Sequence, residues 1–124
     1  MKNLLDTHTL LWFLNGEKLS DDIKSLILDG ENYVSIVTLW EVAIKMNIGK
    51  YSFDGGFAAF CELVYQNGFE VLHIRDEYMQ QLFDLPLIHR DPFDRLIIAT
   101  AICEDATILT ADENIQKYAV LWLW

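Results

Sequence analysis

Short apolar segments alternate with amphipathic segments of about ten residues along the chain, and this alternation restricts the fold more than any other feature. The short segments, rich in branched residues, predict buried strands, whereas the longer ones predict helices. Strands that alternate with helices form βαβ units, in which right-handed crossovers place helices on both faces of the sheet. We therefore expect an α/β protein with α/β/α layers around a mostly parallel central sheet.

Helix caps and helix-breaking residues set the boundaries of the expected elements. The expected strands are residues 2–5, 33–37, 70–74, 107–109 and 120–124. The expected helices are residues 9–14, 21–28 (capped by Ser20), 39–48, 57–66, 77–85, 92–103 and 113–117, with a loop at 87–91. Parallel strands end at the same edge of a sheet, and ligands of such folds bind beyond that carboxyl edge.

A chain of 124 residues, of which 52% are hydrophobic, is long enough to bury one core. No linker or repeat interrupts it, so we expect residues 1–124 to form a single domain. No apolar stretch reaches the roughly 20 residues that a membrane-spanning helix requires. Cys61 and Cys103 lie in apolar helical patterns and are interpreted as buried, reduced thiols. We therefore expect a cytoplasmic protein with no membrane partner.

The chain carries 19 Asp and Glu residues against 9 Lys and Arg, a formal net charge of -10. Passive binding of nucleic acid depends on Lys and Arg to neutralise phosphates, so this balance argues against it. A bound cation would reverse the local charge that a phosphate meets. The acidic balance therefore excludes a simple nucleic-acid binder but not a metal-dependent enzyme.

Four acidic residues lie at turns that a parallel sheet would bring to one edge. Asp6 ends the first expected strand, and Glu41 lies in the first turn of the helix after the second strand. Asp94 lies in the first turn of the helix that begins at Pro92, and Asp112 follows the strand at 107–109. We expect these carboxylates to converge on one crevice.

Each acid also has a purely structural explanation. Thr38 and Glu41 have the spacing of a capping box, and Asp91 before Pro92 is a good helix cap. The other acids could cap the helices that follow or favour their positive ends. However, carboxylates that converge on one crevice repel one another and lose stability. Such a cluster becomes favourable around a hard dication.

Mg²⁺ and Mn²⁺ prefer oxygen ligands and often bind one or two carboxylates together with substrate phosphates. Such a metal can polarise a phosphoryl oxygen and activate a bound water. The sequence contains no Gly-rich phosphate loop, no GxSxG segment and no HExxH spacing. Metal-assisted hydrolysis of a phosphodiester bond is therefore the reaction that the acids favour.

Several basic residues lie near the acidic turns and are candidates for contacts to phosphate or to the acids, or for a solvated rim. They are His8, His89, Arg90 and Arg95. Lys45 follows Glu41 by one helical turn, which predicts a surface ion pair. The aromatic residues at helical spacings are expected to lie mainly in the core; they are Trp12, Trp40, Phe57, Phe60 and Phe83. The apolar segment 120–124 is either a buried last strand or part of a partner surface.

Four segments, in order along the chain, resemble the successive motifs of PIN domains, and within these the VapC-type toxins of bacterial toxin–antitoxin pairs. They are Leu4-Leu-Asp-Thr-His8, Ser35 with Trp40-Glu-Val-Ala-Ile-Lys45, His89-Arg-Asp-Pro-Phe-Asp-Arg-Leu96 and Leu109-Thr-Ala-Asp112. The resemblance implies a PIN-like α/β/α fold and a Mg²⁺- or Mn²⁺-dependent endoribonuclease that hydrolyses RNA by a metal-activated water. It also implies a homodimer and a cognate antitoxin that obstructs the site.

The resemblance assigns roles position by position. The core acids, expected to bind the metal and carry catalysis, are Asp6, Glu41 and Asp94, with Asp112 as the fourth. Asp91 matches an acid common to this subgroup and could cap the helix that presents Asp94. Thr7 and Thr110 match small polar positions that could orient acids or metal-bound waters.

Two other readings of the acids stay open. A binding module could use an acidic groove to hold a basic partner peptide without any catalysis. A strand that ends in Asp-x-x-Thr also resembles the opening of aspartate-nucleophile phosphatases, with Asp6 as nucleophile. Those enzymes need a second Asp two residues later, and His8 occupies that position here.

Overall fold

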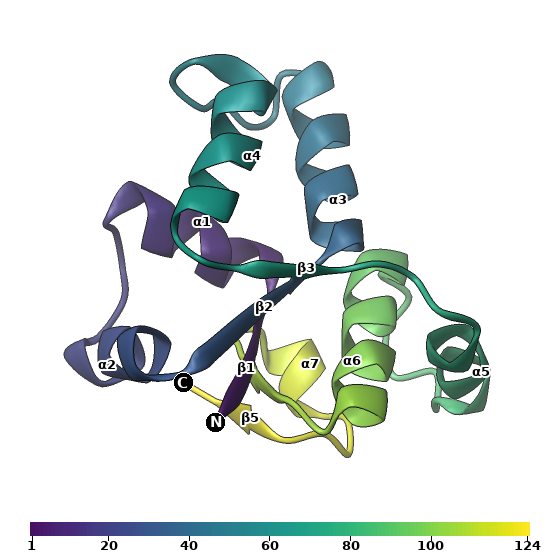
Figure 1. Ribbon diagram of the computed structural model, residues 1–124. Helices are drawn as coiled ribbons and strands as arrows, with labels where there is room; N and C mark the ends of the chain where they lie inside the picture. The colour runs from purple at the N-terminus through teal and green to yellow at the C-terminus, as the bar shows by residue number, and fades with distance from the viewer.

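Five short strands pair in parallel to form one sheet, in the spatial order β3-β2-β1-β4-β5 (Figure 1). In this computed structural model, which describes residues 1–124, the strands are β1 (Lys2–Leu5), β2 (Glu31–Ser35), β3 (Glu70–Leu72), β4 (Thr107–Leu109) and β5 (Trp122–Leu123). Leu4 of β1 lies between Tyr33 of β2 and Ile108 of β4. The expected sheet is thus confirmed, and all of its pairings are parallel.

Seven helices cover the two faces of the sheet (Figure 1). They are α1 (Thr7–Asn15), α2 (Asp21–Asp29), α3 (Ile36–Asn47), α4 (Gly56–Gln66), α5 (Asp76–Asp84), α6 (Pro92–Glu104) and α7 (Glu113–Gln116). Helices α1 to α4 contribute to the core on one face, whereas α6 and α7 cover the other with α5 packed against α6. The expected α/β/α layers are confirmed. No helix is both long and apolar enough to cross a membrane.

The alternation of side chains along each strand divides the core in two. Leu5 and Leu109 are fully buried against α1 to α4, in a cluster that includes Phe60. Leu4 and Ile108, their neighbours in sequence, are fully buried against α6 and α7. Because both faces of β1 and β4 are buried, consecutive residues of each strand are apolar, Leu4-Leu5 in β1 and Ile108-Leu109 in β4, as is typical of parallel sheets.

The boundary between β2 and α3 differs from the prediction. The branched run 33–37 predicts a strand, but β2 ends at Ser35 and α3 begins at Ile36. The hydroxyl of Ser35 accepts a hydrogen bond from the Val37 amide at 3.0 Å and caps the helix. The strand instead begins earlier, because Glu31 pairs with Lys2 of β1. The capping box expected at Thr38 is therefore wrong.

Several expected elements are shorter or shifted, and several side chains expected to be buried are not. β3 ends at Leu72, and β5 contains only Trp122 and Leu123, so most of the segment 120–124 lies exposed at the sheet edge.

Trp40 and Phe83 are 58% and 81% exposed, because each lies on the outer side of its helix. Cys103 is also exposed and Cys61 is half-buried, although both thiols are free as expected.

A buried amide joins the start of β1 to α2 and β2. The side chain of Asn3 is fully buried, and its Nδ2 donates to Leu26 O at 2.9 Å and to Asn32 Oδ1 at 3.0 Å. Gly30 packs directly against this amide. A Cβ atom on Gly30 would lie 2.4 Å from Asn3 Nδ2 and 2.8 Å from Leu26 O, which is closer than any real contact.

We therefore expect Gly30→Ala to lower the free energy of unfolding by about 1–3 kcal/mol, because the methyl group forces the buried amide away from its partners. Urea denaturation measures the change. Ser25→Ala, on the exposed surface of neighbouring α2, is the control and should stay within about 0.5 kcal/mol of the wild type. Equal effects of the two substitutions would show that the amide is not constrained as described.

Candidate active site

Asp6 follows β1 directly and is held by two hydrogen bonds from different parts of the chain. Its side chain caps α1, with Oδ1 accepting from the Thr9 amide at 2.9 Å. Its Oδ2 accepts a short hydrogen bond from the Thr110 hydroxyl, which follows β4. Asp6 is only 4% exposed, and this burial raises the pKa of its carboxyl although the hydrogen bonds oppose the shift. The side chain is therefore rigidly oriented at the carboxyl edge of the sheet.

Glu41 lies beyond the first turn of α3, because that helix begins at Ile36 rather than near residue 39. Its Oε1 accepts from the Thr7 hydroxyl at 2.7 Å, and its Oε2 accepts from Lys45 Nζ at 2.6 Å. Glu41 is 5% exposed, so the pair with Lys45 is not the surface ion pair expected from the spacing. Burial lowers the pKa of Lys45, but its hydrogen bonds to Glu41 and Tyr51 outweigh burial and raise it.

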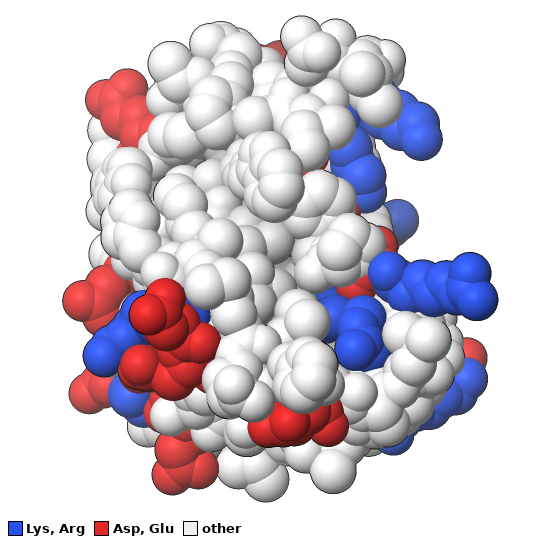
Figure 2. All heavy atoms as spheres, turned by 90° about the vertical axis from the view of Figure 1, so that its right-hand side faces the viewer, with Lys and Arg blue, Asp and Glu red and all other residues white.

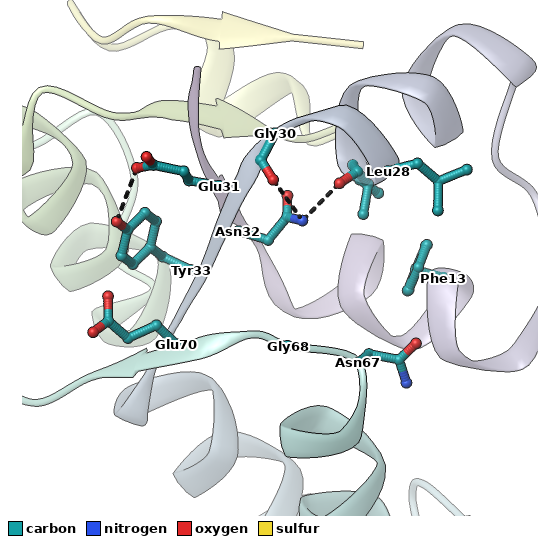
Figure 3. A pocket seen from close by; sticks show the side chains of 10 residues that line it. Phe13, Leu28, Gly30, Glu31, Asn32, Tyr33, Asn67, Gly68 and Glu70 are labelled. Atoms are coloured by element: carbon teal, nitrogen blue, oxygen red, sulfur yellow. Dashed lines mark hydrogen bonds between the residues drawn. The ribbon is translucent and has the colours of Figure 1, made fainter.

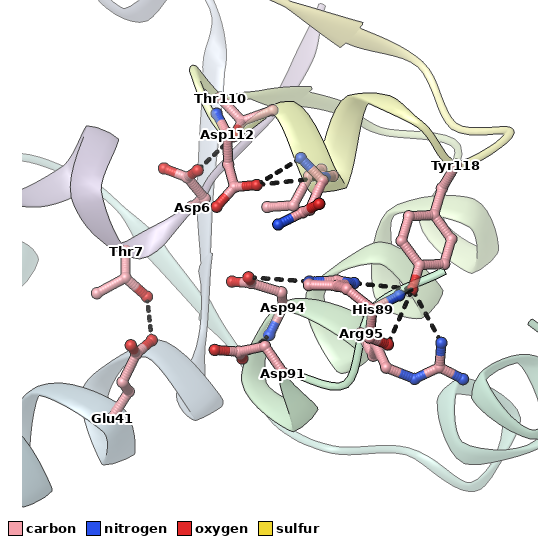
Figure 4. Close-up of polar contacts among 12 residues, drawn as sticks. Asp6, Thr7, Glu41, His89, Asp91, Asp94, Arg95, Thr110, Asp112 and Tyr118 are labelled. Carbon is pink, nitrogen blue, oxygen red and sulfur yellow. Dashed lines mark hydrogen bonds and ion pairs between the residues drawn. The ribbon is translucent and has the colours of Figure 1, made fainter. Parts of the chain in front are cut away.

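Asp94 is presented by the first turn of α6, as predicted. The carboxylate of Asp91 caps this helix by accepting from the Asp94 amide at 2.9 Å, which confirms the predicted cap. Asp94 Oδ2 lies 3.2 Å from His89 Nε2, and the other ring nitrogen of His89, Nδ1, lies 2.9 Å from the Tyr118 hydroxyl. A continuous polar chain thus runs from Tyr118 through His89 to Asp94 (Figure 4).

Burial and neighbouring negative charges both act on the carboxyl of Asp94. Burial and the charge of Asp91 are the main reasons that its pKa rises to about 7. The negative charges of Asp112 and Asp6 raise it further, while the hydrogen bond from His89 opposes the rise. Figure 4 shows the carboxylates of Asp6, Asp94 and Asp112 around one space. Unpaired like charges of this kind favour either a proton or a cation between them.

Asp112 closes the site from the side of β4. Its Oδ1 accepts from the amides of Asn114 and Ile115 at 2.8 and 3.2 Å and thereby caps α7, as predicted. Its own amide donates to Thr110 Oγ1 at 3.0 Å, so Thr110 connects Asp112 to Asp6. A cavity of about 240 Å³ opens beside these two acids.

The donor atoms fit a hard divalent cation in kind. All four predicted ligands are carboxylates, and the crowding of Asp6, Asp94 and Asp112 is what a dication would relieve. No group of three acidic, histidine or cysteine side chains is arranged closely enough to enclose a metal ion. Mg²⁺ does not require such a cage, since it retains several waters and binds one or two carboxylates directly. Glu41, held by Thr7 and Lys45, is suited to contact a metal through water.

The basic residues predicted near the acids differ in their contacts and exposure. His89 faces Asp94, whereas Arg95 points away and donates to Pro86 O and to the Tyr118 hydroxyl, each at 2.9 Å. Arg90 and His8 are exposed. Sequence reasoning missed Tyr118, which has no motif around it, and the segment that carries Tyr51, which reaches the site from the loop after α3.

A second and larger cavity, of about 450 Å³, lies at the opposite edge of the sheet, at the amino ends of β2 and β3 (Figure 3). Its polar walls are engaged within the chain. Asn32 Nδ2 donates to Ile27 O at 2.6 Å, and Glu31 accepts from the Tyr33 hydroxyl at 3.2 Å. No acid of the candidate site lines this larger cavity, so the smaller cavity is the candidate active site.

Charge is unevenly distributed over the surface. On the face drawn in Figure 2, most of the Lys and Arg residues lie along the right-hand margin, whereas Asp and Glu lie mainly at the opposite margin and the base, with some Lys and Arg among them. A broad uncharged area separates them. Although the net charge is -10, not every face of the protein repels a polyanion. The argument from composition against nucleic-acid binding therefore does not apply equally to every face.

A family model of the PIN domain matches residues 4–121. Because the match spans nearly the whole chain, the protein belongs to the PIN domain family. PIN domains are generally nucleases, and they typically use divalent metal ions. A search of curated proteins gives no significant match.

Solved structures of similar fold come from several bacteria. VapBC2 from Rickettsia felis, bound to a DNA fragment from its promoter, matches with a TM-score of 0.78 and 17% identity over 100% of this chain and 99% of that chain. DNA-bound VapBC from Salmonella typhimurium matches with a TM-score of 0.74 and 17% identity over 100% and 97%. FitAcB from Neisseria gonorrhoeae matches at 0.65 and 17% over 98% and 96%. At these identities the likeness establishes the fold.

The raised pKa of Asp94 predicts how stability depends on pH without metal. Its pKa is about 7 in the folded protein and near the ordinary value of 3.8 when unfolded, so the folded state binds more protons between these values. Asp94 therefore makes the free energy of unfolding fall as pH rises from about 4 to about 7, by at most about 1.4 kcal/mol per pH unit.

Urea denaturation in chelator, at several pH values, tests this dependence against Asp94→Asn, which stays neutral throughout. Other groups titrate in the same interval, so the quantity of interest is the difference between the two proteins. We expect the variant to gain stability relative to the wild type as pH rises toward 7. Parallel curves would contradict the crowding of carboxylates around Asp94.

Proposed function

We propose that this protein is a Mg²⁺- or Mn²⁺-dependent endoribonuclease and acts as the toxin of a toxin–antitoxin pair. The observation that carries the proposal is the convergence of the Asp6, Asp94 and Asp112 carboxylates around one space (Figure 4). Burial and the charge of Asp91 raise the pKa of Asp94 to about 7, and the charges of Asp112 and Asp6 add to the rise. Membership of the PIN family supports nuclease chemistry. The resemblance to VapC-type toxins and the similar folds of the VapBC structures support the biological role.

Asp6, Asp94, Asp112 and Glu41 would hold the metal directly or through water. When bound there, Mg²⁺ supplies polarisation of the phosphoryl oxygen and a more acidic water for attack on the phosphodiester bond. The chain's own groups orient these acids. Thr110 fixes Asp6, and Thr7 with Lys45 fixes Glu41.

His89 is a positioning residue in this proposal rather than a phosphate ligand. Its Nε2 lies beside Asp94 while Tyr118 contacts its Nδ1, so the ring cannot rotate without losing both contacts. Arg95 supports Tyr118 from the other side by donating to its hydroxyl at 2.9 Å. Polar partners behind metal-binding carboxylates orient them in this way.

The proposed partners are an RNA substrate, a second copy of the chain and a cognate antitoxin, all acting in the cytoplasm. The excess of acidic residues suits an antitoxin that brings basic side chains to the crevice, since complementary charge favours such an encounter. The similar folds of VapBC and FitAcB structures support the antitoxin partner. The homodimer rests on the resemblance alone.

The residue two positions after Asp6 argues against the phosphatase alternative. Aspartate-nucleophile phosphatases need a second Asp at that position, and this chain has His8 there. The binding-module alternative predicts no metal site. Calorimetric titration with Mn²⁺ separates it from the nuclease, because only the nuclease has a site that Asp6→Asn abolishes.

We expect Asp6→Asn and Asp94→Asn each to reduce Mg²⁺-dependent RNA cleavage by about 100-fold or more, because each removes a carboxylate charge from the metal site. Cleavage of a labelled RNA by purified protein, with Mg²⁺ or with chelator, measures this. Asp29→Asn, an exposed acid at the end of α2, is the matched control and should cleave like the wild type. Undiminished cleavage by both site variants would overturn the assignment.

Tyr118→Phe tests the polar chain behind Asp94. The substitution keeps the buried ring but removes the hydroxyl that contacts His89 and Arg95. We expect a tenfold or larger loss of Mn²⁺ affinity or cleavage, about the effect of losing an outer partner of a metal ligand. Calorimetry and cleavage rates measure the two quantities. Wild-type values for both would contradict the positioning role of His89.

A further inference from the structure

Four aromatic rings form a continuous strip beside the acids: Tyr51, His8, Trp12 and Trp124, hereafter the aromatic strip. The ring centroids of Tyr51 and His8 are 6.4 Å apart, those of His8 and Trp12 5.8 Å, and those of Trp12 and Trp124 5.7 Å. These separations are those of contacting aromatic pairs. The strip brings together the loop after α3, helix α1 and the residue after β5.

The two middle rings of the aromatic strip, those of His8 and Trp12, line the cavity next to the acids. The cavity of about 240 Å³ is lined by His8 and Trp12 together with Asp6, Ala111 and Asp112. Trp12 packs against the core as expected, but it is only partly buried and also lines this space. His8 is exposed, and Trp124 is 44% exposed. Aromatic rings, inclined to one another by 34–73°, therefore lie directly beside two of the acids that would hold the metal.

Two lysines flank the aromatic strip in a chain with few cations. Lys45 Nζ lies 5.1 Å from the Tyr51 ring centroid at one end, and Lys18 Nζ lies 5.4 Å from the Trp12 ring centroid toward the other. Lys18 is exposed, so it can exchange its contact with the ring for a contact with a phosphate. Lys45 is engaged by Glu41 and keeps its charge at the edge of the crevice.

We infer that the aromatic strip is a nucleobase-binding subsite, in which an unpaired base of the RNA next to the cleaved phosphate stacks on Trp12 and His8. The inference rests on the proposed function and adds the part of the substrate that the site recognises. Single-stranded RNA is held by proteins through stacking on aromatic side chains together with backbone contacts to cations. The ring faces of His8 and Trp12 offer stacking surface, and Lys18 and Lys45 next to the strip offer positive charge for the backbone.

The strip favours a base over a basic peptide. The strip offers ring faces, and Lys18 and Lys45 beside it would repel the Arg or Lys side chains of a basic peptide. Stacking requires no particular base, because every base has a π-face. The subsite therefore selects unpaired over paired RNA rather than one sequence over another.

The first test measures binding of a short fluorescein-labelled oligouridylate by anisotropy, with Mg²⁺ present and in the Asp94→Asn background so that the RNA stays intact. Trp12→Leu and His8→Ala should each raise Kd by about fivefold to 100-fold, the range expected for loss of base stacking. Trp12→Phe retains a ring and should restore most of the affinity. Tyr65→Ala, which removes a 59% exposed ring on α4, is the matched control and should bind like its parent.

A ligand control separates stacking from charge. An oligomer of the same length made only of abasic ribose phosphates should bind the parent and Trp12→Leu equally. In the otherwise wild-type enzyme, the same strip variants should raise KM for cleavage and leave kcat within about twofold, because the stacked base contributes binding that does not change during the reaction. Thermal unfolding of each variant checks that it is folded, and His8→Ala alters an exposed side chain.

Unchanged Kd for oligouridylate in both Trp12→Leu and His8→Ala would overturn the inference, as would an equal loss of affinity for the abasic oligomer. If the variants bind RNA normally but lose the co-expressed antitoxin, the strip is a protein-docking surface and the inference is wrong. Failure of the proposed function is distinguishable from these outcomes, because it appears as no Mg²⁺-dependent cleavage by the wild type.

Discussion

Strand β1 is hydrogen-bonded on both sides, to β2 and to β4, and the position of the whole site depends on this double pairing. In a parallel sheet the segments that follow neighbouring strands must leave from the same edge. Asp6 after β1 and Thr110 after β4 therefore meet, and α3 after β2 brings Glu41 alongside them. Because both faces of β1 are fully buried, its register cannot shift without exposing core side chains.

The site keeps its carboxylates apart by tying each one to a different neighbour. Asp6 is bound to Thr110, Glu41 to Thr7 and Lys45, and Asp94 to His89. These contacts come from separate elements, so each carboxylate keeps its own hydrogen-bond partner and its own position in the site. The carboxylates still repel one another, and this repulsion favours binding of a cation between them. The proposed metal-dependent reaction depends on this effect.

The fold was predictable from sequence because its signals are local. Alternating apolar patterns, Ser20 and Asp91 as caps, and the acids at the ends of strands all depend on neighbouring residues. The boundary of β2 was not predictable, because its pairing with Lys2 and the cap at Ser35 override the preference of branched residues for strands.

The predicted acids lie as expected at the carboxyl edge, but their supports could not be predicted. Tyr118 reaches His89 across 29 residues, and Lys45 reaches Tyr51 through the loop after α3. Such contacts depend on the packing of helices and loops, for which the sequence contains no local pattern. Trp12 illustrates the same point, since helical spacing indicates an apolar face but not whether a cavity opens over it.

The hydrogen bond from Thr110 to Asp6 also determines when the site can form. These residues are 104 positions apart in the chain, and β4, which must pair with β1 to bring them together, is complete only at Leu109. Contacts of such long range are the slowest to form in folding, because the closure of the chain must come first. Asp6 is synthesised 104 positions before Thr110, so it lacks this partner until β4 has been made and has paired with β1. Folding intermediates in which β4 is not yet paired therefore lack an oriented Asp6 carboxylate.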